Sequence, residues 1–308
     1  MTDSKAVKPK IIAIVGATGA GKTEFAIQLA SRFKAEIICA DSIQIYKSLN
    51  IGSAKPSSKQ LKQVKHHLVD QLELDEPYSS AIFSSLAKQP IKTILQKNKL
   101  PVICGSAMLY IKNLVYGIAD IPPIPDSVRL LANQTWQTKG ASYCLNWIKE
   151  LTGEDNFKFT DPQRVKRALE VALHTGKSIV SYQSAHSFND NHFNCLFIEV
   201  SLPRKQLYEI IEERVDEMIK NGLVNEVSAL LKKGVRHDIK PLQAIGYKQT
   251  VSYLLGKITY NQMIEQIKTK TKNYAKRQLS WYRKQPDIKK FAKWGKEAEA
   301  TVSEFLKK

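Results

Sequence analysis

The sequence predicts an α/β fold: a phosphate-loop core on a mainly parallel sheet, interrupted by a helical insertion domain and completed by a helical C-terminus. Two observations predict the core. Short β-branched runs alternate with stretches of helical spacing, which is typical of parallel βαβ units. The first run is followed directly by a glycine-rich segment that opens a helix. A third observation predicts the insertion, because residues 128–182 have helical character without a convincing strand.

The elements of the core follow in order along the first third of the chain. An amphipathic helix is expected over Lys22–Phe33, where apolar residues recur at helical spacing, and another near Ala81–Lys97. Apolar runs predict buried strands at Ile11–Gly16, Glu36–Ala40, Leu100–Gly105 and, less clearly marked, Lys65–Asp70.

A change of pattern marks the domain organisation. The Pro-rich segment IADIPPIPDS follows the last of these strands, and strand character returns at Asn194–Leu202. A long helix then begins at Pro203 and ends near Asn221 and Gly222, a C-cap signal, with helices expected from there to the C-terminus. The predicted parts are residues 1–119 as the first part of the core, 120–193 as a helical insertion, and 194–308 as the second part with basic C-terminal helices.

The charge of the chain predicts an anionic partner. Lys and Arg number 47 against 29 acids, which gives a net charge of +18. Such a charge repels itself in a compact fold, so nucleic acid is the expected partner, with a merely solubilising surface as the alternative.

Other features exclude several classes of protein. The four cysteines lie far apart without a CxxC pair, so buried free thiols are expected rather than disulfides or metal ligands. The segment Met1–Lys10 lacks the apolar region of a signal peptide, and no run of about 18 apolar residues predicts a membrane span. We expect a cytoplasmic monomer that contacts no membrane.

One segment matches the phosphate-loop pattern GxxxxGK[ST] between a strand and a helix. Backbone N–H groups of such a loop converge on phosphate oxygens, and the helix N-terminus adds partial positive charge. The lysine supplies a point charge and the final hydroxyl can ligate Mg²⁺. The predicted phosphate-binding residues are Gly16, Ala17, Thr18, Gly19, Ala20, Gly21, Lys22 and Thr23, with Thr23 as the metal ligand and Mg²⁺ as the cofactor.

Asp41 is the acid best placed to work with this loop. It directly follows the second predicted strand, and ligands of doubly wound sheets bind outside the carboxyl ends of strands. A turn or N-cap role is the alternative. By itself, a phosphate loop with an acid is typical of nucleotide kinases and NTPases.

Five further segments resemble the tRNA dimethylallyltransferase family, also called tRNA isopentenyltransferases. They occur in the family's order and spacing, from about residue 11 to residue 284. The segment Asp41–Pro56 resembles DSxQxYKxxDIGTAKP, and His66–Leu68 its paired-histidine motif. Thr160–Glu170 resembles NDxxRxxRALE, Ile245–Gln249 matches IGYxQ, and Ala275–Arg283 resembles AKRQxTWxR.

The resemblance implies a reaction. The family transfers a dimethylallyl group from dimethylallyl diphosphate to N6 of the adenine 3′ of the tRNA anticodon and releases diphosphate. Asp41 is then the general base, Thr23 is catalytic through the metal, and Arg214 joins the loop in binding diphosphate. The implied tRNA-binding residues are Asp41, Ser42, Ile43, Gln44, Ala107, Arg129, Gln163, Arg164, Val165, Lys166, Arg167, Gly246, Tyr247, Lys276, Arg277, Gln278 and Trp281.

The chain departs from the family pattern at three positions. Ala107 replaces a threonine that lies near the target nucleotide in the family, Lys272 replaces an arginine, and Ile210 falls where the family has an arginine. The phosphate loop and Asp41 keep the pattern.

The residues themselves leave alternatives open. Arg214 lies on or beside the apolar stripe of its helix, so an ion pair with an acid such as Asp70, or snorkelling to solvent, competes with diphosphate binding. The paired histidines favour structural hydrogen bonds over metal binding.

Two basic regions also have both an RNA-binding and a structural interpretation. The residues at 163, 164 and 167 fit a solvated helix face as well as an RNA contact. Residues 268–284 carry seven basic side chains, no acid and interleaved aromatics, which suits single-stranded RNA or a helix packed on the core.

Three other functions remain to be distinguished from the tRNA reaction. They are an ATP-dependent kinase or NTPase with an RNA-binding tail, a non-catalytic RNA-binding relic, and an isopentenyltransferase acting on free AMP.

Overall fold

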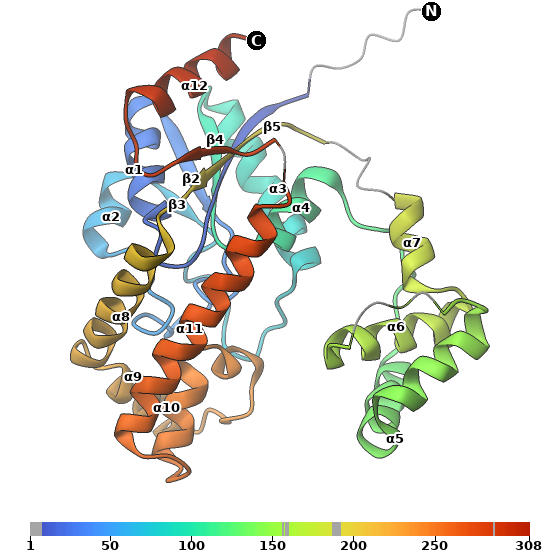
Figure 1. Cartoon of the computed structure of the whole chain (residues 1–308). Coiled ribbons are helices and arrows are strands. Elements are labelled where there is room, and N and C mark those ends of the chain that lie inside the picture. Colours follow the sequence, from blue (N-terminus) through green and yellow to red (C-terminus); the bar gives the residue numbers. More distant parts are fainter. Residues whose placement is uncertain (1–7, 156, 158–159, 187–191, 286) are drawn as a thin grey trace, which may run out of the picture. The chain divides into compact units, whose positions relative to one another are not determined.

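A parallel sheet organises the chain in the computed structural model, which describes residues 8–155, 157, 160–186, 192–285 and 287–308. Residues 1–7, most of the segment for which no signal peptide is expected, lie outside this part. The sheet of the described residues has six strands in the order β3-β2-β4-β1-β5-β6, and every pairing is parallel (Figure 1). The strands are β1 Lys10–Val15, β2 Ala35–Cys39, β3 His66–His67, β4 Leu100–Cys104, β5 Asn194–Val200 and β6 Lys289–Phe291.

The helices follow the sequence pattern closely. Those before β5 are α1 Lys22–Arg32, α2 Ser58–Gln63, α3 Ser80–Gln96, α4 Met108–Tyr116, α5 Asp126–Thr152, α6 Pro162–Thr175 and α7 Ile179–His186. Those after it are α8 Arg204–Lys220, α9 Leu223–Lys232, the short 3₁₀ turn η1 Lys240–Gln243, α10 Tyr247–Leu254, α11 Tyr260–Tyr282 and α12 Lys296–Lys307.

The chain forms two compact units. One comprises Met1–Val115 and His192–Lys308, and holds the sheet; the other is Tyr116–Asn191, with α5, α6 and α7. The fold is therefore the α/β phosphate-loop class predicted from the sequence. The smaller unit has its own core, in which Cys144, Ile148, Val165 and Leu169 are fully buried between α5 and α6.

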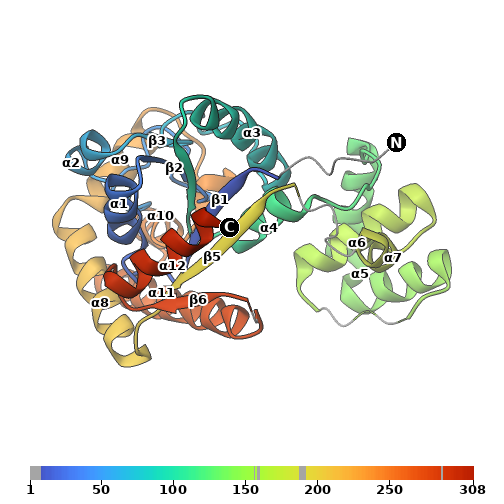
Figure 2. The same ribbon diagram turned by 90° about the horizontal axis from the view of Figure 1, so that it is seen from above.

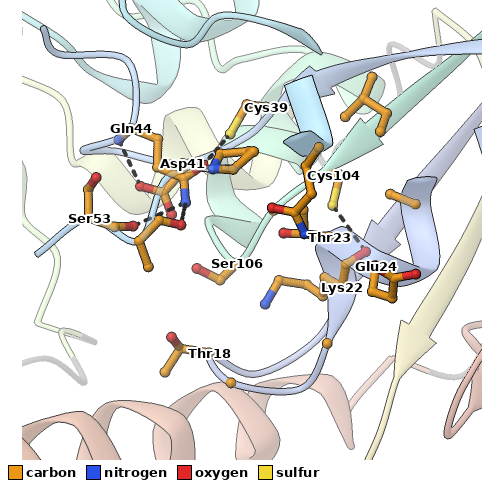
Figure 3. Close-up of a pocket in the computed structure, with 18 of the residues that line it drawn as sticks. Thr18, Lys22, Thr23, Glu24, Cys39, Asp41, Gln44, Ser53, Cys104 and Ser106 are labelled. Atoms are coloured by element: carbon orange, nitrogen blue, oxygen red, sulfur yellow. Dashed lines mark hydrogen bonds between the residues drawn. The ribbon is translucent and has the colours of Figure 1, made fainter. Parts of the chain in front are cut away.

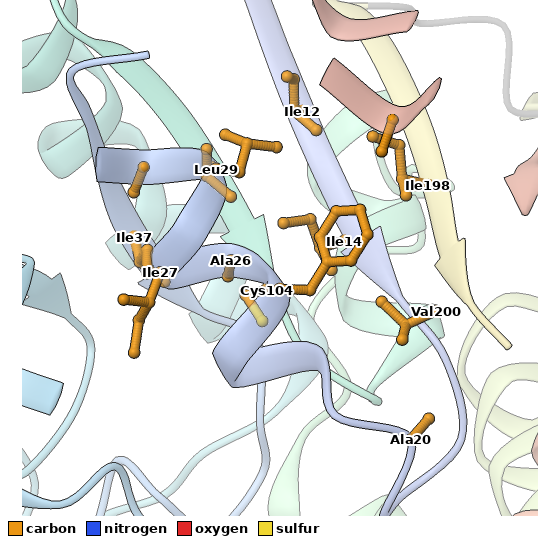
Figure 4. Packing of buried hydrophobic residues seen from close by; sticks show 14 of the residues in the cluster. Ile12, Ile14, Ala20, Ala26, Ile27, Leu29, Ile37, Cys104, Ile198 and Val200 are labelled. Carbon is orange, nitrogen blue, oxygen red and sulfur yellow. The ribbon is translucent and has the colours of Figure 1, made fainter. Parts of the chain in front are cut away.

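Helices cover both faces of the sheet in the larger unit. Figure 2 shows α1 on one side of the strands and α3 on the other. On the α1 face, Ile12 and Ile14 of β1 pack against Leu29 of α1 and against residues of α12 (Figure 4). The strands β1, β2 and β4 are almost entirely buried, which explains their continuous apolar runs.

The register of the sheet gathers three loops at one edge. Ile14 of β1 and Cys39 of β2 both align with Cys104 of β4, so these three strands end side by side. The segments that follow them therefore start from neighbouring points at the carboxyl end of the sheet. This is the edge where ligands bind in doubly wound sheets, and Figure 1 shows α8 and α11 on the same side.

The structure corrects one expectation for the C-terminal part. Residues 289–291 form β6 beside β5, where helices alone were expected. Three residues with the sequence Lys-Lys-Phe carry no apolar alternation, so only pairing with β5 identifies them as a strand. The third predicted strand is shorter than expected, with two residues at the sheet edge.

The structure can also be compared with the predictions about the cysteines, membrane spans and paired histidines. The four cysteines are free thiols, three of them buried. None of the described helices is long and apolar enough to cross a membrane. His66 Nδ1 donates to the Val64 carbonyl at 2.8 Å, and His67 Nε2 bonds Glu36 at 2.8 Å, which agrees with the structural interpretation of the histidines.

Candidate active site

The phosphate loop connects β1 to α1 in the conformation that its glycines permit. Gly16, Gly19 and Gly21 all have positive φ angles. A Cβ on Gly16 would lie 2.5 Å from the Val200 carbonyl oxygen of β5, so any larger residue would displace the loop from the sheet. Glycine is required here by close packing as well as by the backbone angle.

Helix α11 holds the loop from the other side. The Thr18 N–H donates to Gln278 Oε1 at 2.9 Å, and Gln278 Nε2 donates to the Ser106 carbonyl at 3.3 Å. The Tyr282 hydroxyl donates to the Gly16 carbonyl at 3.2 Å. Gln278 therefore bridges the phosphate loop and the segment after β4, a supporting role that the basic character of this helix did not indicate.

A cavity of about 320 Å³ opens over the loop (Figure 3). Thr18, Lys22 and Thr23 lie on its loop side, and Asp41 and Gln44 lie across from them. The Lys22 ammonium donates to the Ala17 carbonyl at 2.8 Å. Burial, with the nearby Arg214 charge adding to it, lowers the pKa of Lys22 to about 8. An anion bound in this cavity would relieve that cost.

Asp41 is fixed by a tight turn. Its Oδ1 accepts from the Ile43 N–H at 2.9 Å and from the Gln44 N–H at 3.2 Å, while its Oδ2 accepts no hydrogen bond within the described part of the chain. The turn role considered from sequence is thus real, and it leaves one carboxylate oxygen available at the cavity.

The Gln44 side chain is engaged with its own surroundings. Its Nε2 donates to the carbonyls of Ser53 and Ala54 at 3.1 and 3.2 Å, and its Oε1 accepts from Cys39 Sγ at 2.9 Å. In this arrangement Gln44 braces the cavity wall formed by residues 53–54.

Arg214 of α8 is half-buried and lines the same cavity. The alternative ion pair with Asp70 is wrong, because Asp70 pairs with Lys55. Arg214 itself forms no ion pair or hydrogen bond with another described residue. Burial lowers the pKa of Arg214, and the proximity of Asp41 opposes that shift only in part. A half-buried guanidinium of this kind favours an anionic ligand.

A second cavity, of about 390 Å³, adjoins the first and is largely apolar. Ile211, Val215, Met218 and Ile267 contribute apolar wall. It shares with the first cavity the residues Thr18, Asp41, Ser53, Ser106 and Arg214. Ser53 and Ser106 were not predicted from sequence, although Ser53 lies in the segment Asp41–Pro56 that the family resemblance covers.

The predicted tRNA-binding residues of the larger unit occupy different environments. Those lining the second cavity are Asp41, Ser42, Ile43, Gly246, Tyr247 and Arg277. Lys276 is exposed on α11, Gln278 is buried, and Trp281 is half-buried with the Lys112 ammonium 4.8 Å from its ring centroid. Ala107 lines neither cavity, and its N–H donates to the Ala40 carbonyl at 3.3 Å.

The remaining predicted residues lie in the smaller unit. Arg129 is exposed on α5 and pairs with Asp126 at 3.1 Å. On α6, Gln163 and Arg164 are exposed after the Asp161 cap, while Lys166 bonds Asn133 and Arg167 pairs with Glu170 at 3.0 Å. The Val165 side chain is fully buried, so any RNA contact from this residue is limited to its backbone.

The residues at the loop fit Mg²⁺ on the condition that the ion takes only one or two ligands from the protein. No group of three or more His, Cys, Asp or Glu side chains suitable for a metal occurs in the described ranges. Mg²⁺, however, commonly takes one or two protein ligands and completes its octahedron with water and substrate phosphate. The Thr23 hydroxyl lines the loop cavity and matches that requirement.

Comparisons with known proteins agree with this arrangement. The model of the family described as IPP transferase matches residues 44–285. A tRNA dimethylallyltransferase 1 of Trichlorobacter lovleyi is 39% identical over 282 residues, covering 91% of this chain and 92% of the relative. A tRNA dimethylallyltransferase of Carboxydothermus hydrogenoformans is 38% identical over 301 residues, with 96% of each chain covered.

Solved structures show the same similarity. A tRNA Δ(2)-isopentenylpyrophosphate transferase of Staphylococcus epidermidis superposes with a TM-score of 0.71 at 31% identity, covering 97% of this chain and 99% of the other. A eukaryotic dimethylallyltransferase solved acting on tRNA gives a TM-score of 0.79 at 26% identity, with 92% and 74% covered. With most of its length matched by the family model and by relatives at this identity, the chain belongs to the IPP transferase family.

Proposed function

We propose that this chain is a tRNA dimethylallyltransferase. It transfers the dimethylallyl group of dimethylallyl diphosphate to N6 of the adenine immediately 3′ of the anticodon and releases diphosphate. The observation that carries the proposal is the junction of the two cavities. A cavity over the phosphate loop and a mainly apolar one share Asp41 and Arg214, so a donor diphosphate and an acceptor base can meet beside one carboxylate and one cation.

Different residues act on the acceptor amine and on the leaving diphosphate. The adenine amine is a weak nucleophile, because its lone pair is delocalised into the ring. As its nitrogen bonds to the first carbon of the donor, the carbon–oxygen bond to diphosphate breaks and the Asp41 carboxylate accepts the N6 proton. The loop N–H groups, Lys22 and Arg214 stabilise the negative charge that grows on the departing diphosphate.

Thr23 is the proposed protein ligand of a magnesium ion, with water and substrate phosphate completing its coordination. When bound, the ion supplies additional positive charge to the leaving diphosphate. The other contributions come from the protein itself: Gln278 holds the phosphate loop in its conformation, and Lys22 lies at the cavity.

The acceptor is RNA rather than free AMP. A free nucleotide needs only a pocket, whereas this chain carries a net charge of +18 and a separate helical unit with exposed Gln163 and Arg164. A charge of this size suits a long polyanion. The base must leave the stack of the anticodon loop to reach the cavity, at a cost of a few kcal/mol, which is lowest for unpaired bases.

Incubation with dimethylallyl diphosphate and unmodified tRNA, followed by nucleoside mass spectrometry, tests the proposal. We expect dimethylallyl-adenosine at the position 3′ of the anticodon. An unmodified product despite tight tRNA binding identifies a non-catalytic RNA-binding protein. Steady phosphate release from ATP without prenyl transfer identifies an NTPase instead.

A competition experiment separates the two acceptors. AMP and an anticodon stem-loop are offered at equal concentration, and we expect the stem-loop alone to react. A higher kcat/KM for AMP overturns the tRNA assignment. Charge reversal at Arg164 and Arg167 should raise KM for the stem-loop without changing the affinity for the diphosphate, with charge reversal at the exposed Lys232 of α9 as the matched control.

A further inference from the structure

One acidic side chain outside the two cavities holds a wall that both of them share. Glu226 lies in the first turn of α9. Its Oε2 accepts from the Asn50 and Ile51 N–H groups, each at 2.9 Å, and its Oε1 accepts from the Gly52 N–H at 3.3 Å. Three successive backbone donors thus converge on one carboxylate, in the manner of an anion-binding nest.

Tyr247 of α10 completes this arrangement. Its hydroxyl donates to Glu226 Oε1 at 2.8 Å and accepts from the Ser53 N–H at 3.1 Å. A Cβ on Gly52 would lie 2.6 Å from the tyrosine ring, so the turn packs directly on the ring. Tyr247 is fully buried, and its polar atom is committed to this contact.

The segment held by Glu226 connects to the catalytic carboxylate. Residues 53 and 54 accept the two hydrogen bonds of the Gln44 amide. The Gln44 N–H in turn donates to Asp41 Oδ1 and helps to define the turn that orients Asp41. A shift of the segment 50–54 therefore removes the partners of Gln44 and loosens the turn.

We propose that Glu226 is a positioning residue, which acts through the backbone of residues 50–54 and Gln44 to keep Asp41 in the geometry for proton transfer. The proposal rests on the proposed function and deepens it. Glu226 lines neither cavity, so its effect is indirect. The phosphate loop is supported separately by Gln278 and Tyr282, so the shape of the loop does not depend on Glu226.

Two variants of Glu226 separate its contacts from its charge. Glu226→Gln keeps the length of the side chain but loses charge-assisted bonds, while Glu226→Asp keeps the charge at the helix N-terminus but shortens the reach. We expect each to lower kcat about tenfold, because a misplacement on the order of 1 Å costs up to about 10²-fold. Tyr247→Phe should lower kcat as well and combine with Glu226→Gln in a less than additive way.

The measurement is single-turnover prenyl transfer with both substrates saturating, well below every melting midpoint, together with a diphosphate titration. The matched control is Glu265→Gln, which removes the same charge from an exposed site on α11. A fall in kcat with unchanged diphosphate Kd supports the proposal, whether or not the melting midpoint falls. Variants as active as Glu265→Gln, or variants whose kcat, diphosphate affinity and melting midpoint fall together, overturn it.

Failure of the proposed function gives a different result. In that case the unaltered protein and Glu265→Gln both lack prenyl transfer, whereas failure of the positioning role alone leaves both fully active.

Discussion

Asp41 and Lys22 line one cavity with opposite charges and different surroundings. Among the described residues, Asp41 has one oxygen committed to its own turn and one available, while the Lys22 ammonium has one hydrogen bond, to a loop carbonyl. The first arrangement suits a proton acceptor held in place, and the second suits a cation that awaits an anion. Each role makes a separate prediction.

Asp41→Asn should bind dimethylallyl diphosphate and tRNA normally but transfer the prenyl group about 10²–10⁴-fold more slowly. The amide keeps the shape and the turn acceptor but cannot take up a proton, and general bases contribute rate factors of this order. Single-turnover rates with saturating substrates measure the loss. A variant within threefold of the unaltered protein removes Asp41 from the catalytic role.

Lys22 predicts a pH dependence of binding. Its folded-state pKa of about 8 lies below the ordinary 10.5, and a bound diphosphate raises it again by stabilising the charged form. Binding should therefore take up protons above about pH 8, and affinity should weaken as pH rises. Calorimetry at pH 8.5 in buffers of different ionisation enthalpy measures the uptake.

Lys22→Arg is the control for that experiment, because a guanidinium stays charged throughout this range. Uptake that persists in the variant assigns the proton to another group.

The same shift affects folding: between about pH 8 and 10.5 the unfolded chain binds more protons at this residue, so the unfavourable contribution of buried Lys22 to stability is relieved as pH rises through that window.

At the scale of the element, α11 combines two roles on different faces. Ala275 and Tyr282 are buried against the core, and Gln278 bonds the phosphate loop, whereas Lys276 and Arg277 are exposed. The alternative of a core-packed helix is therefore correct for part of its surface. The exposed basic face remains the predicted RNA contact.

Gln278→Ala should weaken diphosphate binding and lower stability by about 1–3 kcal/mol. The change leaves the Thr18 N–H and the Ser106 carbonyl without their partner, and unsatisfied buried groups cost this much. Denaturant unfolding and a diphosphate titration measure the two effects. Ser280→Ala on the exposed face is the control, and equal affinities in the two variants would show that the loop does not need the bridge.

The elements differ in how far the sequence predicts them. The strand, loop and helix at residues 10–32 are predicted because hydrophobic period, glycines and motif agree over a short span. The strand at 289–291 is not, since two of its three residues are lysines and its stability comes from β5. Local pattern carries no information about such a partner.

The residues of the site also differ in how far the sequence predicts them. Asp41 and the loop follow from motif and strand position, and both line the first cavity of the structure. Glu226 and the bridging role of Gln278 were missed, because their partners lie 174–176 and 260 residues away in sequence. A single acid in an amphipathic helix has no local signal that distinguishes a surface charge from a backbone clamp.

At the scale of the whole molecule, the net charge of +18 predicts that tRNA affinity falls steeply with salt. Lys and Arg contacts release condensed counterions, so six phosphate contacts give a log–log slope of roughly −4 to −5. Titrations from about 50 to 200 mM KCl measure it. A slope near zero would contradict an electrostatic grip on the RNA, while diphosphate affinity serves as an internal reference with a shallower slope.

The bridge from Gln278 to Thr18 also has a consequence for biosynthesis. The loop emerges early from the ribosome, but the side chain that braces it is synthesised 260 residues later. At translation rates of about 5–20 residues per second, this leaves the loop unbraced for on the order of ten to fifty seconds. A nascent chain therefore acquires a finished phosphate site only after α11 has been translated, and a transcript cut short before that helix yields a protein whose phosphate loop lacks this support.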